Sequence, residues 1–301
     1  MKLRSIELGL PDPGAAASFM TRIWGMAQAE VRGGTHYLRG SGAFPYLVAF
    51  EPSEEPFVRS VTFVCSRDRL AEIACQAMDR KVPARPTVSE DPGGGDGLLI
   101  EFAEGTIFRF LADTSEVAPI AGHDLPVKLT HVVINSVDAE VCSDIAEDIL
   151  GFLVSDRTKA MVFVRCNDSH HSTAFARAGF ASLNHIAFEM EDVDAVMRGI
   201  GRLRDHGMAP AWGPGRHGPG ANVFAYFVAP FGPVIEFSTA VDKVSDDYPV
   251  GNPEDWTWPE GRIDRWGLSD KDFEGLKQAE ERFRFRRDWE PASLNEILEH
   301  C

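Results

Sequence analysis

LTHVVINSVD (129–138) repeats LRSIELGLPD (3–12), and this internal repeat decides the fold. Two further pairs of segments repeat in the same order, LNHIAFEM (183–190) with VRSVTFVC (58–65) and GPVIEFST (232–239) with GTIFRFLA (105–112). The three offsets are 126, 125 and 127 residues, so the chain consists of two modules of nearly equal length.

The two copies differ at three positions that bear on chemistry. The paired residues are Ser5 and His131, Ser60 and His185, and Arg109 and Glu236. Two imidazoles and one carboxylate on separate strands are the ligand set that holds Fe(II) or Mn(II) on one face and leaves the opposite face open. We therefore predict a metal site in the second copy and a metal-free first copy.

Each half reads twice as a strand, a helix and then several strands, which predicts two βαβββ modules per half. The fold class is α+β, with each half forming an open curved sheet or barrel. We divide the chain into a metal-free domain (1–120), a catalytic metal-binding domain (121–242) and a C-terminal extension that packs over both (243–301). The extension should hold an ordered loop rich in Pro, Gly and Trp, followed by a helix within 269–289.

Strand periodicity predicts that the three ligand candidates converge. Leu129, His131, Val133 and Asn135 alternate onto one sheet face, and Glu236 lies opposite its apolar neighbours. A hairpin centred on Phe231 puts Tyr226 directly across from Glu236, with the Cβ atoms ~5 Å apart. A phenol would then stand beside the metal-binding carboxylate.

Composition restricts the classes of partner. A hydrophobic content of 44% and a charged content of 25% are typical of a soluble globular protein. A net charge of −16 argues against nucleic acid and anionic membranes as partners. No apolar run approaches a membrane span or a signal segment, so we expect a cytoplasmic protein. The five cysteines are widely spaced, and we expect them to be reduced and free of disulfides.

The second half resembles the type I extradiol (catechol meta-cleaving) dioxygenases of the vicinal oxygen chelate superfamily. The matching segments are LTHVV with His131, NDSHH with His170 and His171, LNHIAFE with His185, GPGRHGPGANVFAYFVAPFG with His217 and Tyr226, and VIEFST with Glu236. His170 precedes His185 by 15 residues, and His217 and Tyr226 precede Glu236 by 19 and 10 residues. The interval 131–185 is short for that family, which puts the shape of the substrate pocket in doubt.

The resemblance implies a reaction and a role for each residue. Fe(II), or alternatively Mn(II), on His131, His185 and Glu236 would bind a small aromatic diol with O₂ as co-substrate. The ring would open beside the diol to give a muconic semialdehyde-type product. His170 would be the acid–base residue, which leaves His171 solvated or structural, and His217 and Tyr226 would hydrogen-bond the substrate oxygens. We also expect a homo-oligomer, a dimer or tetramer.

Two other classes of function stay open at this point. One is a different metal enzyme on the same scaffold, an isomerase or a glyoxalase-like lyase, and the other is a non-catalytic small-molecule-binding protein. GPGRHG (213–218) fits a dinucleotide fingerprint but leads into a strand and not a helix, so we expect no such cofactor. The identity of the ring stays open, as does contact between substrate and Arg262 or Arg265 of the extension.

Overall fold

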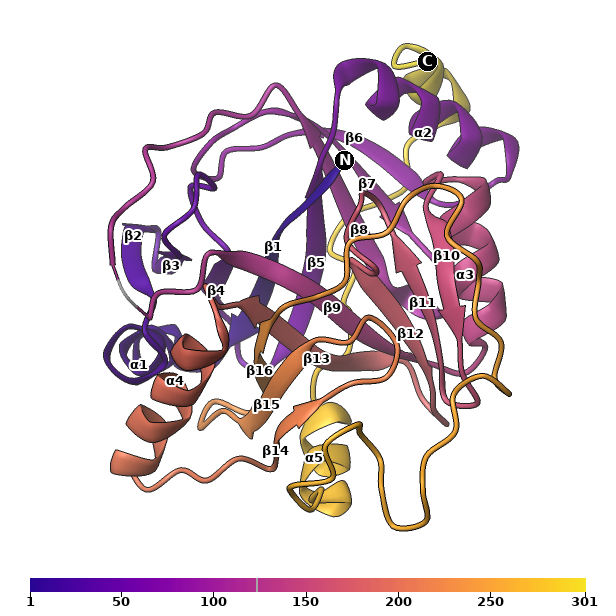
Figure 1. Cartoon of the computed structure of the whole chain (residues 1–301). Coiled ribbons are helices and arrows are strands. Elements are labelled where there is room, and N and C mark those ends of the chain that lie inside the picture. The colour runs from indigo at the N-terminus through magenta and orange to yellow at the C-terminus, as the bar shows by residue number, and fades with distance from the viewer. Residues whose placement is uncertain (123) are drawn as a thin grey trace.

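The predicted two-domain architecture is confirmed by a computed structural model, which describes residues 1–122 and 124–301. His123, inside the segment expected to link the halves, lies outside the described residues. Each half forms one eight-stranded mixed sheet with helices packed against it (Figure 1). Among the described residues, no helix is long and apolar enough to cross a membrane.

The first half builds a sheet of strand order β2-β3-β4-β1-β5-β8-β7-β6. A π-helical turn (Met20–Trp24) extends its first helix, and a 3₁₀ turn (Ala103–Gly105) precedes its last strand. The remaining elements are β1 (Lys2–Leu10), α1 (Pro13–Phe19), β2 (Ala27–Arg32), β3 (Thr35–Arg39), β4 (Val48–Pro52), β5 (Phe57–Val64), α2 (Arg67–Asp79), β6 (Ala84–Val88), β7 (Asp96–Glu101) and β8 (Ile107–Ala112).

The second half repeats this arrangement in the order β10-β11-β12-β9-β13-β16-β15-β14. Its elements are β9 (Lys128–Ser136), α3 (Ala139–Asp148), β10 (Leu153–Arg157), β11 (Met161–Arg165), β12 (Thr173–Arg177), β13 (Ser182–Glu189), α4 (Val193–Asp205), β14 (Trp212–Arg216), β15 (Val223–Val228) and β16 (Val234–Thr239). The two βαβββ modules of the half meet where β9 pairs antiparallel with β13. Aspartates begin both helices, because Asp138 and Asp192 accept hydrogen bonds from backbone N–H groups of the first turn.

Two β-bulges change which side chains share a face. Thr130 is the extra residue between the pairs His131–Ala187 and Leu129–Phe188. Leu129 is therefore turned into the apolar core, and the prediction that it shares a face with His131 is wrong. Asn184 is the extra residue on β13, so it can lie on the same side of the sheet as its neighbour His185.

The two halves share one apolar core. The indole of Trp24 from the first half stacks on Phe237 of β16, with ring centroids 3.7 Å apart. Arg202 of α4 donates hydrogen bonds of 2.7 Å to the carbonyls of Ile23 and Trp24. These contacts hold the two sheets in a fixed relation, so the functional site has a rigid support.

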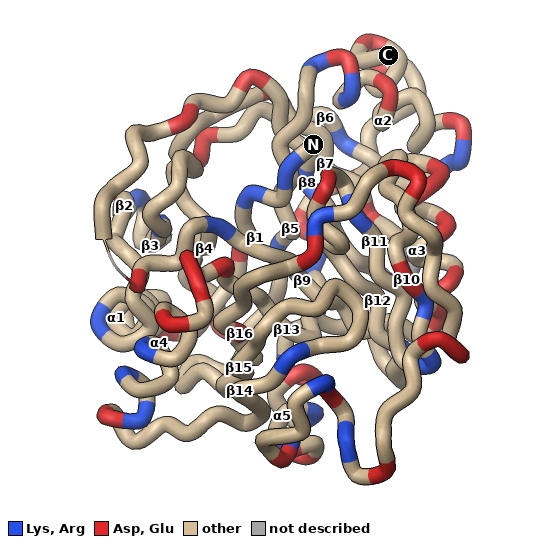
Figure 2. The backbone as a smooth tube through the Cα atoms, viewed as in Figure 1, with Lys and Arg blue, Asp and Glu red and all other residues tan. Residues whose placement is uncertain are grey.

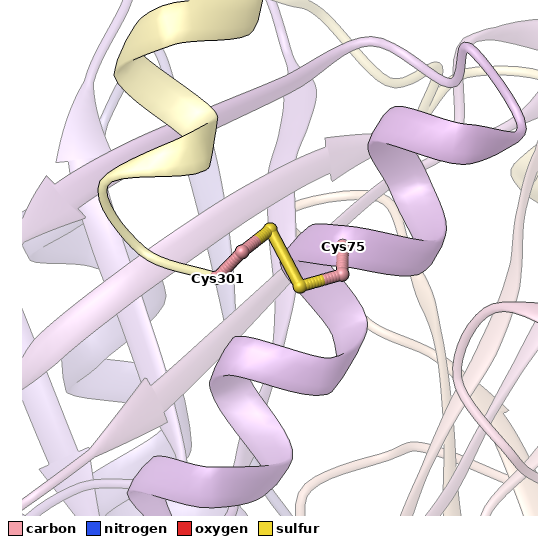
Figure 3. Close-up of a disulfide and its surroundings, with 2 residues drawn as sticks. All are labelled: Cys75 and Cys301. Atoms are coloured by element: carbon pink, nitrogen blue, oxygen red, sulfur yellow. A yellow bond between two sulfur atoms is a disulfide. The ribbon is translucent and has the colours of Figure 1, made fainter.

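The C-terminal extension contacts both halves. Its first helix, α5 (Phe273–Glu280), packs against β13, β15 and β16, whereas α6 (Leu294–Leu298) packs against α2 and β6 of the first half. Cys75 of α2 and Cys301 form a disulfide at this contact (Figure 3). The expectation of five reduced cysteines is wrong for this pair, because a sequence separation of 226 residues hides the packing of α6 on α2.

Candidate metal centre

Three central strands carry the predicted ligands to one point inside the second sheet. His131 lies on β9, His185 on β13 and Glu236 on β16, and all three side chains are buried. The Nε2 atoms of the two histidines are 3.2 Å apart. Oε2 of Glu236 lies 3.3 Å from Nε2 of His131 and 3.1 Å from Nε2 of His185. One cation can therefore reach an atom of each side chain.

The register of the strands explains this convergence. Ala187 of β13 is the pairing partner of His131 on β9 and also of Glu236 on β16. Directly paired residues project to the same face with Cβ atoms ~5 Å apart, so the two ligands flank the small methyl group of Ala187. His185 is two positions earlier on the same strand and projects to the same side. A larger side chain at position 187 would fill the space between the ligands.

The charges at this point fit a divalent cation. Burial raises the pKa of Glu236, but the two imidazoles of His131 and His185 beside it outweigh burial and hold that pKa below its usual range. Burial lowers the pKa of His185, which keeps its imidazole in the ligating neutral form. Among the described residues, Glu236 Oε2 has no hydrogen-bond donor, and a buried carboxylate oxygen without a partner is costly. A metal ion bound between the three side chains would remove that cost.

Asparagines orient two of the ligands. Asn184 Oδ1 accepts a hydrogen bond of 2.6 Å from His185 Nδ1, which leaves His185 Nε2 free to bind a metal. Asn222 Nδ2 donates to Glu236 Oε1 at 3.2 Å and to Ser238 Oγ at 2.9 Å. Sequence reasoning missed both asparagines. The position of Asn184 next to His185 was the available signal, but only the bulge turns it toward the site.

The two predicted substrate-side residues lie in the same cavity as the triad. Tyr226 pairs with Glu236 as the hairpin register predicted, and its hydroxyl is 3.4 Å from His185 Nε2. His217 Nε2 is 3.0 Å from the Tyr226 oxygen. Burial lowers the pKa of His217 to about 3. Burial and the charge of Glu236 raise the pKa of Tyr226 well above its usual value, so the phenol keeps its proton.

The histidine pair at 170 and 171 is arranged differently from the prediction. His171 is buried, lines the cavity and has its ring centroid 4.3 Å from that of His131. His170 points away from the triad, with Nε2 2.6 Å from Oδ2 of the fully buried Asp156. The two Nδ1 atoms are 3.0 Å apart, so Asp156, His170 and His171 form one buried hydrogen-bonded chain. His171 and not His170 lines the cavity, because neighbouring residues on an extended chain point to opposite sides.

The first half places a polar centre at the corresponding point. Arg109 there forms ion pairs with Glu7 at 3.0 Å and Asp91 at 2.6 Å, and its Nη2 donates to the Tyr46 hydroxyl at 2.9 Å. Ser5 and the other first-copy counterpart, Ser60, both donate to Glu7. A guanidinium thus takes the place of the proposed metal.

This internal symmetry also bears on the histidine pair. Val48 of β4 and Thr173 of β12 take the same place beside the first strand of their half, an offset of 125 residues. Tyr46 and His171 are then equivalent, and Tyr46 faces the first-half centre as His171 faces the triad.

A cavity of about 720 Å³ opens from the triad toward the C-terminal extension. Its aromatic walls include Phe163, Phe180 and Trp212, whereas Phe175 and Phe224 are fully buried and do not line it. Four residues that the extension contributes are Trp256, Trp258, Ile263 and Lys271. Arg262 and Arg265 are exposed and do not line the cavity. Arg265 instead donates to the Gly218 carbonyl at 2.9 Å.

Known proteins are similar to this chain in sequence. Residues 128–237 match the protein family described as the Glyoxalase/Bleomycin resistance protein/Dioxygenase superfamily. Metapyrocatechase 2 of Cupriavidus necator is 30% identical over 140 residues, which cover 46% of this chain. The match spans only 41% of the length of that relative.

Two solved structures match over almost the whole chain. A Mn(II)-bound glyoxalase from Novosphingobium aromaticivorans has a TM-score of 0.84 and 27% identity, over 97% of this chain and 96% of that one. Homoprotocatechuate 2,3-dioxygenase from Arthrobacter globiformis has a TM-score of 0.85 and 19% identity, over 97% and 95% of the two chains. The latter likeness concerns the fold alone.

Proposed function

We propose that this chain, whose residues 128–237 belong to the Glyoxalase/Bleomycin resistance protein/Dioxygenase superfamily, is an extradiol ring-cleaving dioxygenase. It would insert both atoms of O₂ into a substituted catechol next to the diol and release a muconic semialdehyde-type product. The observation that carries the proposal is one cavity lined by two histidines that converge on the buried Glu236 and also by His171, His217 and Tyr226.

The metal would bind to His131, His185 and Glu236. When bound, Fe(II), with Mn(II) as the alternative, would supply an open coordination face at which a diol and O₂ meet and exchange electrons. The convergence of one oxygen and two nitrogen atoms and the lack of a donor for Glu236 Oε2 in the described chain support this assignment.

Tyr226 and His217 would position the diol. With His217 Nε2–H donating to the Tyr226 oxygen, the phenolic proton is free to be donated to a substrate oxygen. Tyr226 keeps that proton at neutral pH because burial and Glu236 raise its pKa. Its fixed place opposite Glu236 aims the proton at the atom on which charge develops.

His171 would exchange protons with the substrate. Burial lowers the pKa of His171 well below its usual value, so its imidazole is neutral and one ring nitrogen has a free lone pair toward a diol hydroxyl. Because Nδ1 of His171 faces His170, Nε2 is the nitrogen left for the substrate. His170 and Asp156 would hold the ring of His171 in place from behind.

The test is reconstitution with Fe(II) in the absence of O₂, followed by exposure to O₂ with a panel of substituted catechols. We expect uptake of one O₂ per catechol and a coloured semialdehyde with at least one compound. A protein that binds neither Fe(II) nor Mn(II) stoichiometrically would contradict the proposal, as would a metal-loaded protein that consumes no O₂ with any diol.

A glyoxalase-like lyase is the second candidate, favoured by the 27% identity to the Mn(II)-bound glyoxalase. Such an enzyme has no use for O₂. Turnover of an adduct of a 2-oxoaldehyde and a thiol by the metal-loaded protein, with no O₂ uptake, would select this alternative. The position of Tyr226 and His217 beside the open metal face favours the dioxygenase.

Replacing Tyr226 with phenylalanine tests the substrate-side proton. Tyr226→Phe keeps the ring that packs on Trp212 and removes only the hydroxyl, so we expect bound metal to be unchanged and kcat to fall about 100-fold. Metal analysis and steady-state kinetics check this. Tyr46→Phe, which removes a hydroxyl from the first-half centre, is the matched control and should leave kcat unchanged. Loss of metal from Tyr226→Phe would make the hydroxyl part of the metal site.

A further inference from the structure

Lys271 is held at one wall of the cavity by the backbone around it. The N–H of the next residue, Asp272, donates to the carbonyl of Ala211 at 2.8 Å, and Ser269 Oγ accepts from the Gly213 N–H at 2.9 Å. These bonds fix the extension on β14, where Nζ of Lys271 lies 4.3 Å from the ring centroid of Trp212. The position of the ammonium group is therefore set by the fold.

That ammonium group forms no ion pair with any described residue. Within residues 1–122 and 124–301, no carboxylate oxygen lies within 4.0 Å of its Nζ. The nearby carboxylate of Glu280 instead accepts a hydrogen bond from Asn135 at 3.2 Å. Acidic and basic segments lie close together around α5 (Figure 2), and Glu280 of that helix attracts the ammonium group without forming an ion pair with it.

The other cationic side chains of the cavity are either paired with a carboxylate or exposed to solvent. Arg177 is already paired with Glu140, and the side chains of Lys159 and Lys277 are exposed at the rim. Lys271 is half-buried, and burial lowers the pKa of its amine. Among the described cations of the cavity, it is the one that is partly buried and forms no ion pair.

A positive charge held between aromatic walls costs free energy unless a group of opposite charge binds beside it. The face of Trp212 offsets a part of the cost by a cation–π contact, with Phe273 at a longer distance of 5.2 Å. An anion in the cavity would offset more, because opposite charges attract strongly where water is excluded. The same cavity reaches the triad, so such an anion would belong to the substrate.

The distance between Trp212, which contacts Lys271, and the triad suits a small aromatic molecule. Trp212 pairs with Tyr226 on β15, and Tyr226 pairs with Glu236 on β16. Two strand spacings separate the backbone of Trp212 from that of Glu236, which amounts to ~10 Å. A diol at the triad, its ring beside Tyr226 and a short side chain would span that length.

We infer that Lys271 binds an anionic group of the substrate, and that the substrate is a catechol with a carboxylate on a short side chain. This inference rests on the proposed function, because it assumes that the diol lies at the triad. It narrows the substrate class from any substituted catechol to an acidic one.

The experiment compares carboxylic acids with their methyl esters. The Fe(II)-loaded protein is assayed with 3,4-dihydroxybenzoate, 3,4-dihydroxyphenylacetate and 3-(3,4-dihydroxyphenyl)propanoate, each beside its ester. We expect wild type to prefer at least one acid over its ester in kcat/KM. We expect Lys271→Met to reduce that ratio about tenfold or more, because one partner of a partly buried charge pair is lost. Anaerobic calorimetry with the same pairs should give the same change in Kd without turnover.

Lys277→Met is the matched control, since it removes a charge from the exposed rim of the same cavity and should leave the acid-to-ester ratio unchanged. Lys271→Arg should retain most of the preference. If wild type cleaves acids and esters equally, or if both methionine variants change the ratio alike, Lys271 does not bind a substrate anion although the dioxygenase proposal stands. If no catechol is cleaved while metal is bound, the proposed function itself fails.

Discussion

Replacing Glu236 with alanine is expected to abolish metal binding and, with it, all turnover. Glu236 is the sole anionic member of the triad, and its Oε2 lies within 3.3 Å of both ligand nitrogens. Two buried imidazoles without a carboxylate hold a divalent ion far more weakly. Metal analysis after anaerobic reconstitution should give no stoichiometric Fe(II) or Mn(II), and O₂ uptake with any catechol should be absent.

The stability of the variant separates this effect from misfolding. Metal-free Glu236→Ala should stay folded, with the circular dichroism spectrum of metal-free wild type, because the apolar core shared by the two halves does not include this side chain. Added metal should stabilise wild type by ~3 kcal/mol at a hundredfold excess over Kd and should leave the variant unchanged. Glu280→Gln, which removes a different carboxylate charge from the cavity, is the matched control and should keep its metal. Full metal retention by Glu236→Ala would refute the assigned site.

Replacing His171 with phenylalanine should lower kcat by about 10²- to 10⁴-fold while the metal stays bound. The variant keeps a planar ring of similar size beside His131, so the ligand set is not disturbed. It removes the nitrogen that would accept the proton of the diol. Single-turnover kinetics with a pre-bound catechol would place the loss in the chemical steps, with little change in substrate affinity.

His170→Phe provides the comparison. His170 is fully buried and contacts Asp156 and the other histidine, but it does not line the cavity. We expect it to keep the metal and to slow turnover less than His171→Phe does, because it acts on the substrate only through its neighbour. A larger loss of kcat in His170→Phe, with His171→Phe near wild type, would reverse the two roles.

The sequence repeat was sufficient for the architecture and for the three ligand strands. Strands of alternating pattern and aspartate-capped helices are local signals, and the offset between the copies added the long-range information. The pairing of Tyr226 with Glu236 followed from simple counting around the hairpin, because no bulge interrupts β15 and β16. Short strands were harder to identify, and β14 in particular runs through the Gly- and Pro-rich segment from Trp212 to Arg216, which has no alternating pattern.

The failures have a common physical origin in irregular backbone and distant contacts. Bulges at Thr130 and Asn184 shift the alternation by one residue, which moved Leu129 off the ligand face. The choice between His170 and His171 depended on a spacing that one residue can alter. The contact of α6 with α2 and the position of Lys271 over Trp212 depend on the path of the extension, which has no periodic signal.

Because of the ion pairs of Arg109, the two halves depend differently on the metal available in solution. Its positive charge is carried on a side chain, so the first sheet holds its own cation whatever the supply of metal outside the protein. The second sheet would bind its cation from solution and could release it again. One duplicated architecture thus has a permanent and an exchangeable way to neutralise a buried acid. Only the exchangeable one leaves a coordination face vacant for reactants, whereas each of the three nitrogens of the guanidinium donates to an acceptor of the protein.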